Sequence, residues 1–187
     1  MEGFDFDGYV REAWLGVEQP EGWRTELLGR RIVLSPPLGN RHALGASRLS
    51  RALLGGIPDD WAILRQTAID ISPRLGVLMP DLVVAPRESL RDGWRDEYWF
   101  PAGLVLLVAE IADEDSAMTD RNAKLRAYAH AAVPLYLLID RFADSGPTVE
   151  LHSSPDGVDY RTRTRVPLGD PIELPEPFRM VLETKEF

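Results

Sequence analysis

Three short apolar runs constrain the fold of this chain more than any other feature. They are Met79–Ala85, Leu104–Ile111 and Leu135–Asp140. Each run is too short and too rich in buried-type residues for a surface helix, and this pattern is typical of strands that are covered on both faces. Segments with helical spacing precede and separate the runs. We therefore expect an α/β fold with a mixed central β-sheet flanked by helices.

Helical and strand patterns fill the rest of the chain. A Gly29–Arg30 turn divides a predicted N-terminal hairpin, and Asn40 is a suitable N-cap for a helix. No internal repeat or linker interrupts the pattern, so we expect a single domain over residues 1–187. The other predicted elements, in chain order, are a leading helix within residues 1–20, hairpin strands Arg24–Leu28 and Arg31–Ser35, a helix Asn40–Leu54 with Leu44, Leu49 and Leu53 facing inward, a strand Ala62–Ile71, a helix Asp120–Ala131 capped by Asp120, and C-terminal strands Thr148–His152 and Tyr160–Val166.

Composition excludes several classes of protein. Hydrophobic residues make up 44% and charged residues 27% of the chain, which suits a soluble domain with a substantial core. The absence of Cys rules out disulfides and thiolate zinc sites, and His42, His130 and His152 lack the spacing of metal ligands. The N-terminus has no basic region followed by an apolar stretch, and no apolar run reaches the ~20 residues that span a bilayer. We expect a cytoplasmic protein that does not enter a membrane.

The net charge of -9 argues against a generally basic surface for nucleic acid. Local clusters of basic residues matter more than this total, and they support two interpretations: solvated surface charge or contacts to phosphate. Residues that alternate along a strand share one face, as those of the third cluster do. The three clusters are Arg48 with Arg51, Arg121 with Lys124 and Arg126, and Arg161 with Arg163 and Arg165.

Two acids and one lysine in the middle of the chain have the composition of a metal-dependent hydrolytic site. Asp81 and Glu110 lie in apolar runs, where a carboxylate is costly to desolvate without a cation or hydrogen-bond donors. Lys124 follows on a predicted helix. A shared metal ion explains this set, but Asp81 could also merely begin a strand, Glu110 could form a structural salt bridge with Lys124, and Lys124 could be a solvated helix charge.

An ordered set of motifs resembles the Uma2 (Uma-two) family, a group of restriction-endonuclease-like proteins in the PD-(D/E)XK nuclease superfamily. A Pro-Asp pair alone carries little information, whereas the whole set in this order is specific. The likeness extends over about residues 23–178, and it implies a restriction-endonuclease-like core there. The motifs are Glu26–Arg30, Ser35–Pro37, Asn40–His42, Pro80–Val84, Val108–Ile111, Asp120–Lys124, Tyr128–Ala129, Val133–Tyr136 and Asp140.

The resemblance implies a role for each residue of the site. Asp81 and Glu110 would be metal-binding carboxylates, and Lys124 would be the catalytic lysine supplied from the helix. In the plain form of the superfamily the lysine stands two residues after the second acid, where this chain has Ala112. A migrated lysine is usual for the Uma2 family. Ser followed by Pro is more common there at this position, whereas this chain continues into an acidic loop.

Further residues have weaker assignments. Glu26 matches the acid of the family's first hairpin, and it would add a ligand or hold a metal-bound water. Gln66, expected on a core strand, is a candidate for the lining of the same pocket. Tyr128 lies one helical turn beyond Lys124 and is expected to pack rather than to react. His42, near a helix start, is expected to cap the helix or to lie on the surface.

The function implied is that of a magnesium-dependent endonuclease acting on DNA, with manganese able to replace magnesium. Magnesium is bound by oxygen ligands and keeps several waters, so one or two carboxylates and the substrate phosphate suffice. Lys124, expected at a helix start, would be helped by the helix N-terminus in attracting phosphate. A homodimer would suit the cutting of two strands. The alternatives are a catalytically silent relative that binds nucleic acid or protein, and a hydrolase of another phosphate ester.

Overall fold

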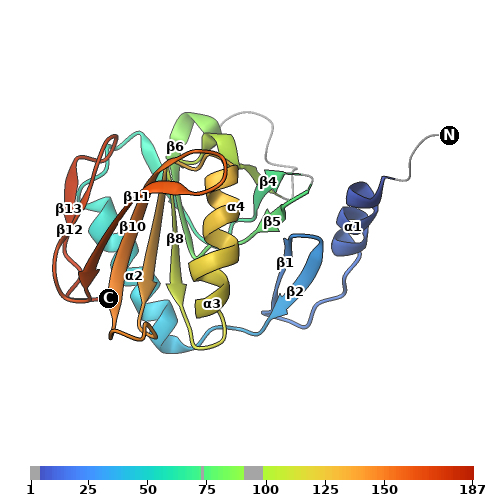
Figure 1. The fold of residues 1–187 in the computed structure, drawn as a ribbon, viewed down its shortest axis with the longest axis horizontal. Coiled ribbons are helices and arrows are strands. Elements are labelled where there is room, and N and C mark those ends of the chain that lie inside the picture. Colours follow the sequence, from blue (N-terminus) through green and yellow to red (C-terminus); the bar gives the residue numbers. More distant parts are fainter. Residues whose placement is uncertain (1–4, 73, 91–98) are drawn as a thin grey trace.

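Two β-sheets and a β-ribbon organise the residues that the structure describes, which are 5–72, 74–90 and 99–187. The structure is a computed structural model with a mixed α/β fold (Figure 1). The larger sheet has the strand order β11-β10-β9-β8-β6-β3, and its neighbours are antiparallel except for the parallel pair β8 and β9. Its strands are β3 (Trp61–Leu64), β6 (Leu82–Pro86), β8 (Leu107–Ala112), β9 (Leu135–Asp140), β10 (Thr148–Pro155) and β11 (Tyr160–Pro167).

The apolar runs form the centre of this sheet, as predicted. Every residue of β8 and of β9 is buried, which explains why both sequences are almost continuously apolar. The second run was expected to begin at Leu104, but β8 begins at Leu107 because the 3-10 turn η3 (Ala102–Leu104) takes up its first part. The buried strand β8 is antiparallel to β6 and parallel to β9, so the sheet is mixed at its centre, as expected.

One helix connects β8 to β9, and it comprises α3 (Ala117–Thr119), the π-helical turn η4 (Asp120–Lys124) and α4 (Leu125–His130). The expectation that Asp120 caps this helix is wrong, because the helix begins at Ala117. Asp113 instead accepts a hydrogen bond from the amide of Ser116 at 2.7 Å and so supports the first turn. Lys124 consequently lies inside the helix, and not beside its N-terminal amides.

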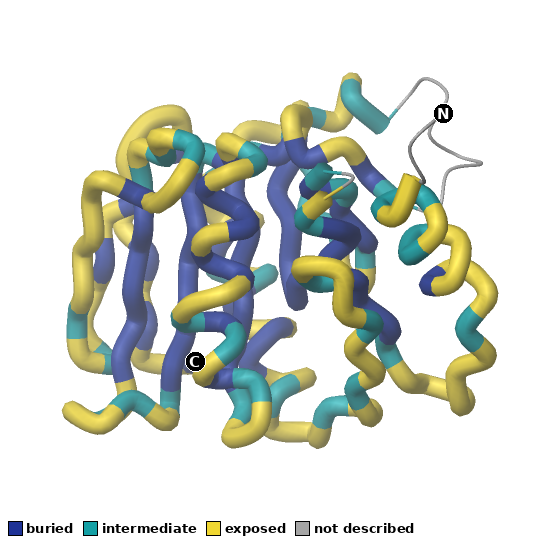
Figure 2. The backbone as a smooth tube through the Cα atoms, turned by 45° about the vertical axis from the view of Figure 1, so that its right-hand side comes forward, coloured by how far each residue is buried: buried dark blue, intermediate teal, exposed yellow. Residues whose placement is uncertain are grey.

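The larger sheet is covered on both faces. The helix α3–α4 lies on one face, where Leu125 and Tyr128 join the core that contains Val108 of β8. Helix α2 (Asn40–Leu54) covers the other face through Leu49 and Leu53. Figure 2 shows the buried strands between these more exposed layers. Helix α2 has the predicted bounds, but its N-cap is Gly39 and not Asn40, which is the first helical residue. Leu44, expected to face inward, is 49% exposed.

A second, five-stranded sheet carries the N-terminal hairpin next to the helix α3–α4 side of the molecule (Figure 1). The hairpin has the predicted bounds and turn. Its neighbour β5 pairs with β1 in antiparallel fashion, and β4 and β7 complete the sheet. The strands, in sheet order, are β2 (Arg31–Ser35), β1 (Arg24–Leu28), β5 (Gly76–Leu78), β4 (Ile69–Ser72) and β7 (Phe100–Pro101).

Two predicted strands differ from the structure at the places where the chain crosses between the sheets. The predicted strand Ala62–Ile71 is wrong as one element, because a turn at Gln66, with φ of 52°, separates β3 from β4. The strand expected to start at Met79 starts at Leu82, since Pro80 has no N–H to donate and separates β5 from β6. The chain crosses between the sheets at both places, and both places border the site described below.

The remaining elements lie toward the ends of the chain. Helix α1 (Phe6–Leu15), predicted from helical spacing, packs through Trp14, whose indole N–H donates to the carbonyl of Thr25 at 3.1 Å. Within the described residues, no helix combines the length and apolarity needed to cross a bilayer. The other elements are the 3-10 turn η1 (Arg87–Leu90) and the ribbon of β12 (Ile172–Leu174) and β13 (Met180–Leu182).

Gly76 allows β5 to approach β1 closely. Its φ is 101°, and an added Cβ would lie 2.0 Å from the carbonyl oxygen of Leu27. We expect Gly76→Ala to lower the free energy of unfolding by at least about 3 kcal/mol, because a backbone overlap adds to the strain of positive φ. Gly169→Ala is the matched control, since φ is 113° there with nothing within 4 Å. Urea denaturation measures both, and equal losses would contradict the role of the close approach.

Candidate active site

The pairing of β6 with β8 brings two of the predicted residues together. Leu82 pairs with Ala109 in an antiparallel register, so continuing that register by one residue places Asp81 opposite Glu110. Asp81 also accepts a hydrogen bond from the amide of Ile111 at 2.8 Å. Asp81 and Glu110 are therefore backbone neighbours at one end of the β6–β8 pair. Their side chains have different partners: Asp81 contacts His42 of α2, and Glu110 contacts Lys124 of the helix α3–α4.

Lys124 lies among three buried carboxylates. Its Nζ is 3.1 Å from Oε1 of Glu110, 3.2 Å from Oε1 of Glu26 and 3.5 Å from Oδ1 of Asp120. The four side chains are between 2% and 7% exposed. The structure thus brings together Glu26, Glu110 and Lys124, which the sequence singled out, and it adds Asp120. We call these four residues the acid–lysine cluster.

Three hydrogen bonds fix the acids of the cluster. The amide of Met79 donates to Oε1 of Glu26 at 2.7 Å, and Ser116 donates to Oδ2 of Asp120 at 2.7 Å. The hydroxyl of Tyr128 donates to Oε1 of Glu110 at 2.7 Å. Tyr128 was expected only to pack, and it does pack in the core, but its hydroxyl also orients Glu110. Each acid therefore has one oxygen that protein donors hold.

The spacing of four residues between Asp120 and Lys124 explains why Asp120 belongs to the cluster. Asp120 and Lys124 are the first and last residues of η4, so their side chains project to the same side of the helix. The hydroxyl of Tyr136, on β9, donates to the backbone carbonyl of Asp120 at 3.0 Å. This bond satisfies a carbonyl in the irregular turn, where the regular helical ladder is interrupted. Sequence reasoning treated Asp120 only as a cap, although its spacing of four residues from Lys124 on a predicted helix is a signal that the two side chains meet.

Asp81 has its own pair of basic partners. Its Oδ1 is 3.1 Å from an Arg24 guanidinium nitrogen, and its Oδ2 is 2.9 Å from Nε2 of His42. His42 therefore neither caps α2 nor lies free on the surface. Burial opposes ionisation of Asp81, but His42, the Ile111 amide and Arg24 together lower its pKa below the usual value. Sequence reasoning missed Arg24, although it lies two residues before Glu26 on β1 and so shares its face.

The electrostatics of the acid–lysine cluster favour an additional cation. Burial raises the pKa of Glu110 well above its usual value despite Lys124, and the like charges of Asp120, Asp81 and Glu26 raise it further. Burial also raises the pKa of Asp120. For Lys124, burial opposes the charged form, but the three acids outweigh it and raise its pKa. The single positive charge of Lys124 cannot neutralise three ionised carboxylates, so an additional cation would stabilise the ionised acids.

The donor set suits a hard divalent cation. Among the described residues, none donates a hydrogen bond to Oε2 of Glu26, to Oε2 of Glu110 or to Oδ1 of Asp120. Carboxylate oxygens are the ligands that Mg²⁺ and Mn²⁺ prefer. Within the described part of the chain, no three acidic or His side chains already have the geometry of a metal site. Binding of a cation would therefore require Lys124 or Arg24 to release a contact.

Two cavities reach the site from opposite sides. One, of about 640 Å³, lies between the β1–β2 hairpin and the helix α3–α4, and Glu26 is part of its lining. The other, of about 310 Å³, is lined by Asp81, Arg24, His42 and Gln66, among others. Gln66 does not lie on a core strand, as expected from the sequence, but in the exposed turn between β3 and β4.

Comparison with known proteins identifies the class. The model of the Uma2 family, described as "Putative restriction endonuclease", matches residues 11–185, and the chain belongs to this family. The fold of this chain is similar to that of a putative nuclease of DUF820 from Anabaena variabilis, whose crystal structure matches with a TM-score of 0.71, 14% sequence identity and 94% of each chain covered. No curated protein matches the chain.

Glu110 should make the apo protein less stable at high pH. A carboxyl whose pKa is raised by folding contributes stability below its unfolded pKa, and this contribution is lost as the pH rises through the folded pKa. We expect the free energy of unfolding to fall less steeply between about pH 5 and about pH 8 in Glu110→Gln than in wild type. Urea denaturation in EDTA measures this slope.

The exposed Glu173 on β12 provides the control, because Glu173→Gln removes the same charge where water solvates it. Its pH slope should equal that of wild type. Equal slopes for Glu110→Gln and wild type would show that Glu110 is not a strained carboxylate in the folded protein.

Proposed function

We propose that this protein is a magnesium-dependent endonuclease with a restriction-endonuclease-like core, which hydrolyses phosphodiester bonds in DNA. The observation that carries the proposal is the position of the Lys124 ammonium, 3.1 Å from Glu110 and 3.2 Å from Glu26. Asp81 precedes β6, the strand that pairs with the Glu110 strand β8. Membership of the Uma2 family supports it. Carboxylates can hold a metal ion that activates a water for phosphodiester hydrolysis, and a lysine can stabilise the charge that develops on the phosphate.

In this proposal Asp81 and Glu110 hold the metal ion, and Mn²⁺ can replace Mg²⁺. When bound, the ion supplies a water of lowered pKa and offsets the charge that grows on the phosphate. Glu26 adds a ligand or holds a water beside the ion. The protein donors to Glu26 and Glu110 all bond to Oε1, so Oε2 of each residue keeps its lone pairs for the metal ion.

The basic and aromatic residues have supporting roles. Lys124 orients the attacking water or stabilises the charge on the phosphate, and its raised pKa keeps it protonated for the second role. Tyr128 positions Glu110, while Arg24 and His42 position Asp81.

The cavity beside Glu26 is the proposed entry for the substrate phosphate. Arg31 and Arg126 are part of its lining, so they bring positive charge to the entrance of a site rich in carboxylates. Such charges attract a polyanion although the whole chain is acidic. Two copies of the chain would allow both strands of a duplex to be cut, and we include a homodimer in the proposal.

Lys124→Ala tests whether this lysine takes part in the reaction. We expect cleavage of supercoiled plasmid in saturating Mn²⁺ to slow by roughly 100-fold, the effect of losing one preorganised electrostatic group. Affinity for Mn²⁺, measured by calorimetry, should stay similar or increase because a nearby positive charge is removed. Lys185, the only other lysine, is exposed, and Lys185→Ala should cut at the wild-type rate.

Stability must be measured in the same variants, because removing a buried cation costs about 3–5 kcal/mol. Circular dichroism and thermal melts identify the temperature range in which Lys124→Ala is folded. Unchanged nicking by the folded variant would remove Lys124 from the chemistry. A wild-type protein that binds DNA and Mn²⁺ but never cuts would instead support the catalytically silent alternative.

A further inference from the structure

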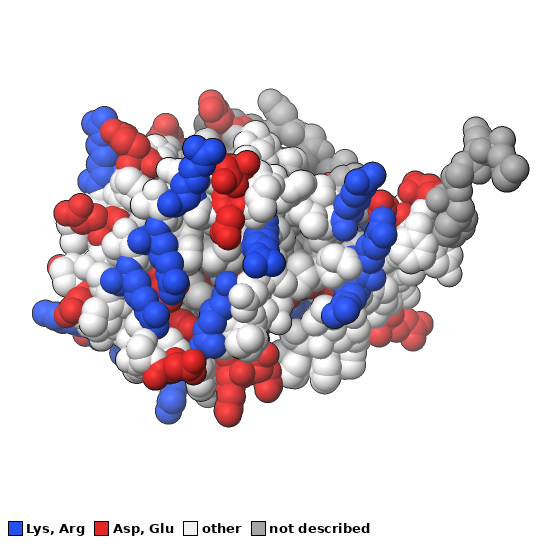
Figure 3. All heavy atoms as spheres, in the orientation of Figure 1, with Lys and Arg blue, Asp and Glu red and all other residues white. Residues whose placement is uncertain are grey.

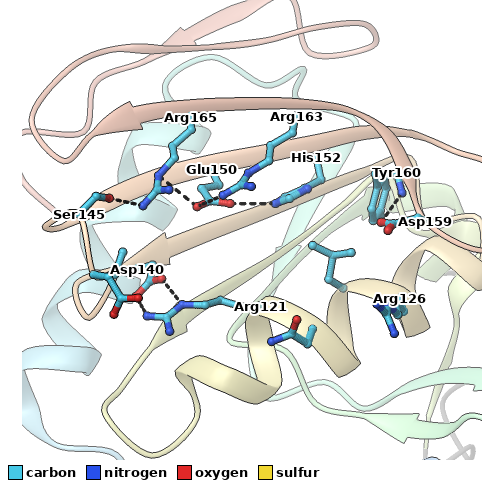
Figure 4. A pocket seen from close by; sticks show the side chains of 14 residues that line it. Arg121, Arg126, Asp140, Ser145, Glu150, His152, Asp159, Tyr160, Arg163 and Arg165 are labelled. Atoms are coloured by element: carbon cyan, nitrogen blue, oxygen red, sulfur yellow. Dashed lines mark hydrogen bonds and ion pairs between the residues drawn. The ribbon is translucent and has the colours of Figure 1, made fainter.

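A groove of about 520 Å³ lies next to the helix α3–α4, outside the proposed catalytic site. It separates this helix from β10 and β11, and Figure 4 shows Arg163 and Arg165 projecting into it from β11, opposite Arg121 and Arg126 of the helix. The groove opens on the sheet face that also carries the acid–lysine cluster. In Figure 3, Lys and Arg side chains gather on this face of the molecule.

A buried carboxylate arranges the two arginines of β11. Oε1 of Glu150 is 2.7 Å from Arg163 and 3.3 Å from Arg165, and Oε2 is 3.2 Å from His152. Although burial opposes ionisation, the bonds from His152 and Arg163 lower the pKa of Glu150 to about 2. Glu150 therefore stays charged at neutral pH. It orders both guanidinium groups but engages only part of the five N–H donors of each.

The two arginines of the helix differ in their contacts. Arg121 donates to both oxygens of the buried Asp140 and to the carbonyl of Phe142, so its role is structural. Arg126 is exposed and forms no hydrogen bond or ion pair with any residue that the structure describes. It also lines both the groove and the cavity that reaches Glu26. The two hollows are therefore neighbours on one surface, with Arg126 between them.

We propose that Arg126, Arg163 and Arg165 bind successive backbone phosphates of a nucleic-acid strand that continues from the cavity at Glu26 into this groove. The inference rests on the proposed function and specifies where its substrate lies. Guanidinium groups match the oxygens of a phosphate, and alternate residues of β11 present them in a row. Glu150 engages one side of Arg163 and of Arg165, and Arg165 also donates to the hydroxyl of Ser145 at 2.6 Å. The other N–H groups of the two guanidinium groups are available to a phosphate.

The exposed acids at the groove limit the strength of binding. Asp144 and Asp159 are part of the lining and reduce the local positive potential. We therefore expect modest affinity that depends strongly on salt, as contacts to phosphate alone produce. Such contacts would position a strand without reading its sequence.

The test is the binding of a short fluorescein-labelled DNA duplex to the full chain in EDTA, followed by anisotropy. Arg126→Gln and Arg163→Gln should each weaken binding about 5- to 10-fold near 0.1 M salt and reduce the slope of log K against log salt by about 0.9. Arg51→Gln is the matched control, because Arg51 is exposed on α2, which covers the opposite face of the sheet. Arg126 has no partner to lose, so Arg126→Gln stays informative if Arg163→Gln folds poorly.

The outcomes separate this inference from the proposed function. If Arg126→Gln and Arg163→Gln bind DNA as Arg51→Gln does while wild type cuts DNA, the groove is excluded and the nuclease remains. If both variants lose affinity but wild type never cuts, the groove binds nucleic acid and hydrolysis is excluded. If labelled polyglutamate, but not DNA, loses affinity in Arg126→Gln, the groove accepts an acidic protein segment and the inference is wrong.

Discussion

The ion pairs of Lys124 with three buried carboxylates are the interaction on which the rest of the site depends. A lysine that is 4% exposed is tolerated only because Glu26, Glu110 and Asp120 surround it, and the acids are tolerated only because of the lysine. Neither side can be removed alone without leaving an uncompensated charge. An arrangement of this kind costs stability, and such costs are typical of functional sites.

The fold explains how residues so distant in sequence meet. The hairpin supplies Glu26, the β6–β8 pair supplies Asp81 and Glu110, and the π-helical turn supplies Asp120 and Lys124. The chain changes sheet on either side of β4 and β5, which places the hairpin next to the helix. Buried β8 and β9 support the cluster, one cavity reaches it at Glu26, and the other cavity reaches Asp81.

Local patterns predicted the elements whose boundaries depend on local chemistry. The hairpin has a turn signal in sequence and α2 has helical spacing of apolar residues, and the bounds of both were correct, although Asn40 is not the N-cap of α2. Long-range contacts determine the rest. Nothing local indicates that a turn at Gln66 divides the predicted strand between two sheets. The cluster of Glu26, Glu110 and Lys124 was foreseen through family motifs, whereas the pairing of Asp81 with Arg24 and His42 required the structure.

The most direct measurement of the central claim is the anomalous scattering of Mn²⁺ in crystals of the protein soaked with the ion. The account predicts a peak within about 2.2 Å of a carboxylate oxygen of Glu110 and of Asp81, with the Lys124 ammonium displaced from at least one acid. A peak elsewhere on the molecule, or no peak while Lys124 keeps its contacts with Glu26 and Glu110, would contradict a metal-dependent site and would leave these residues a structural role only.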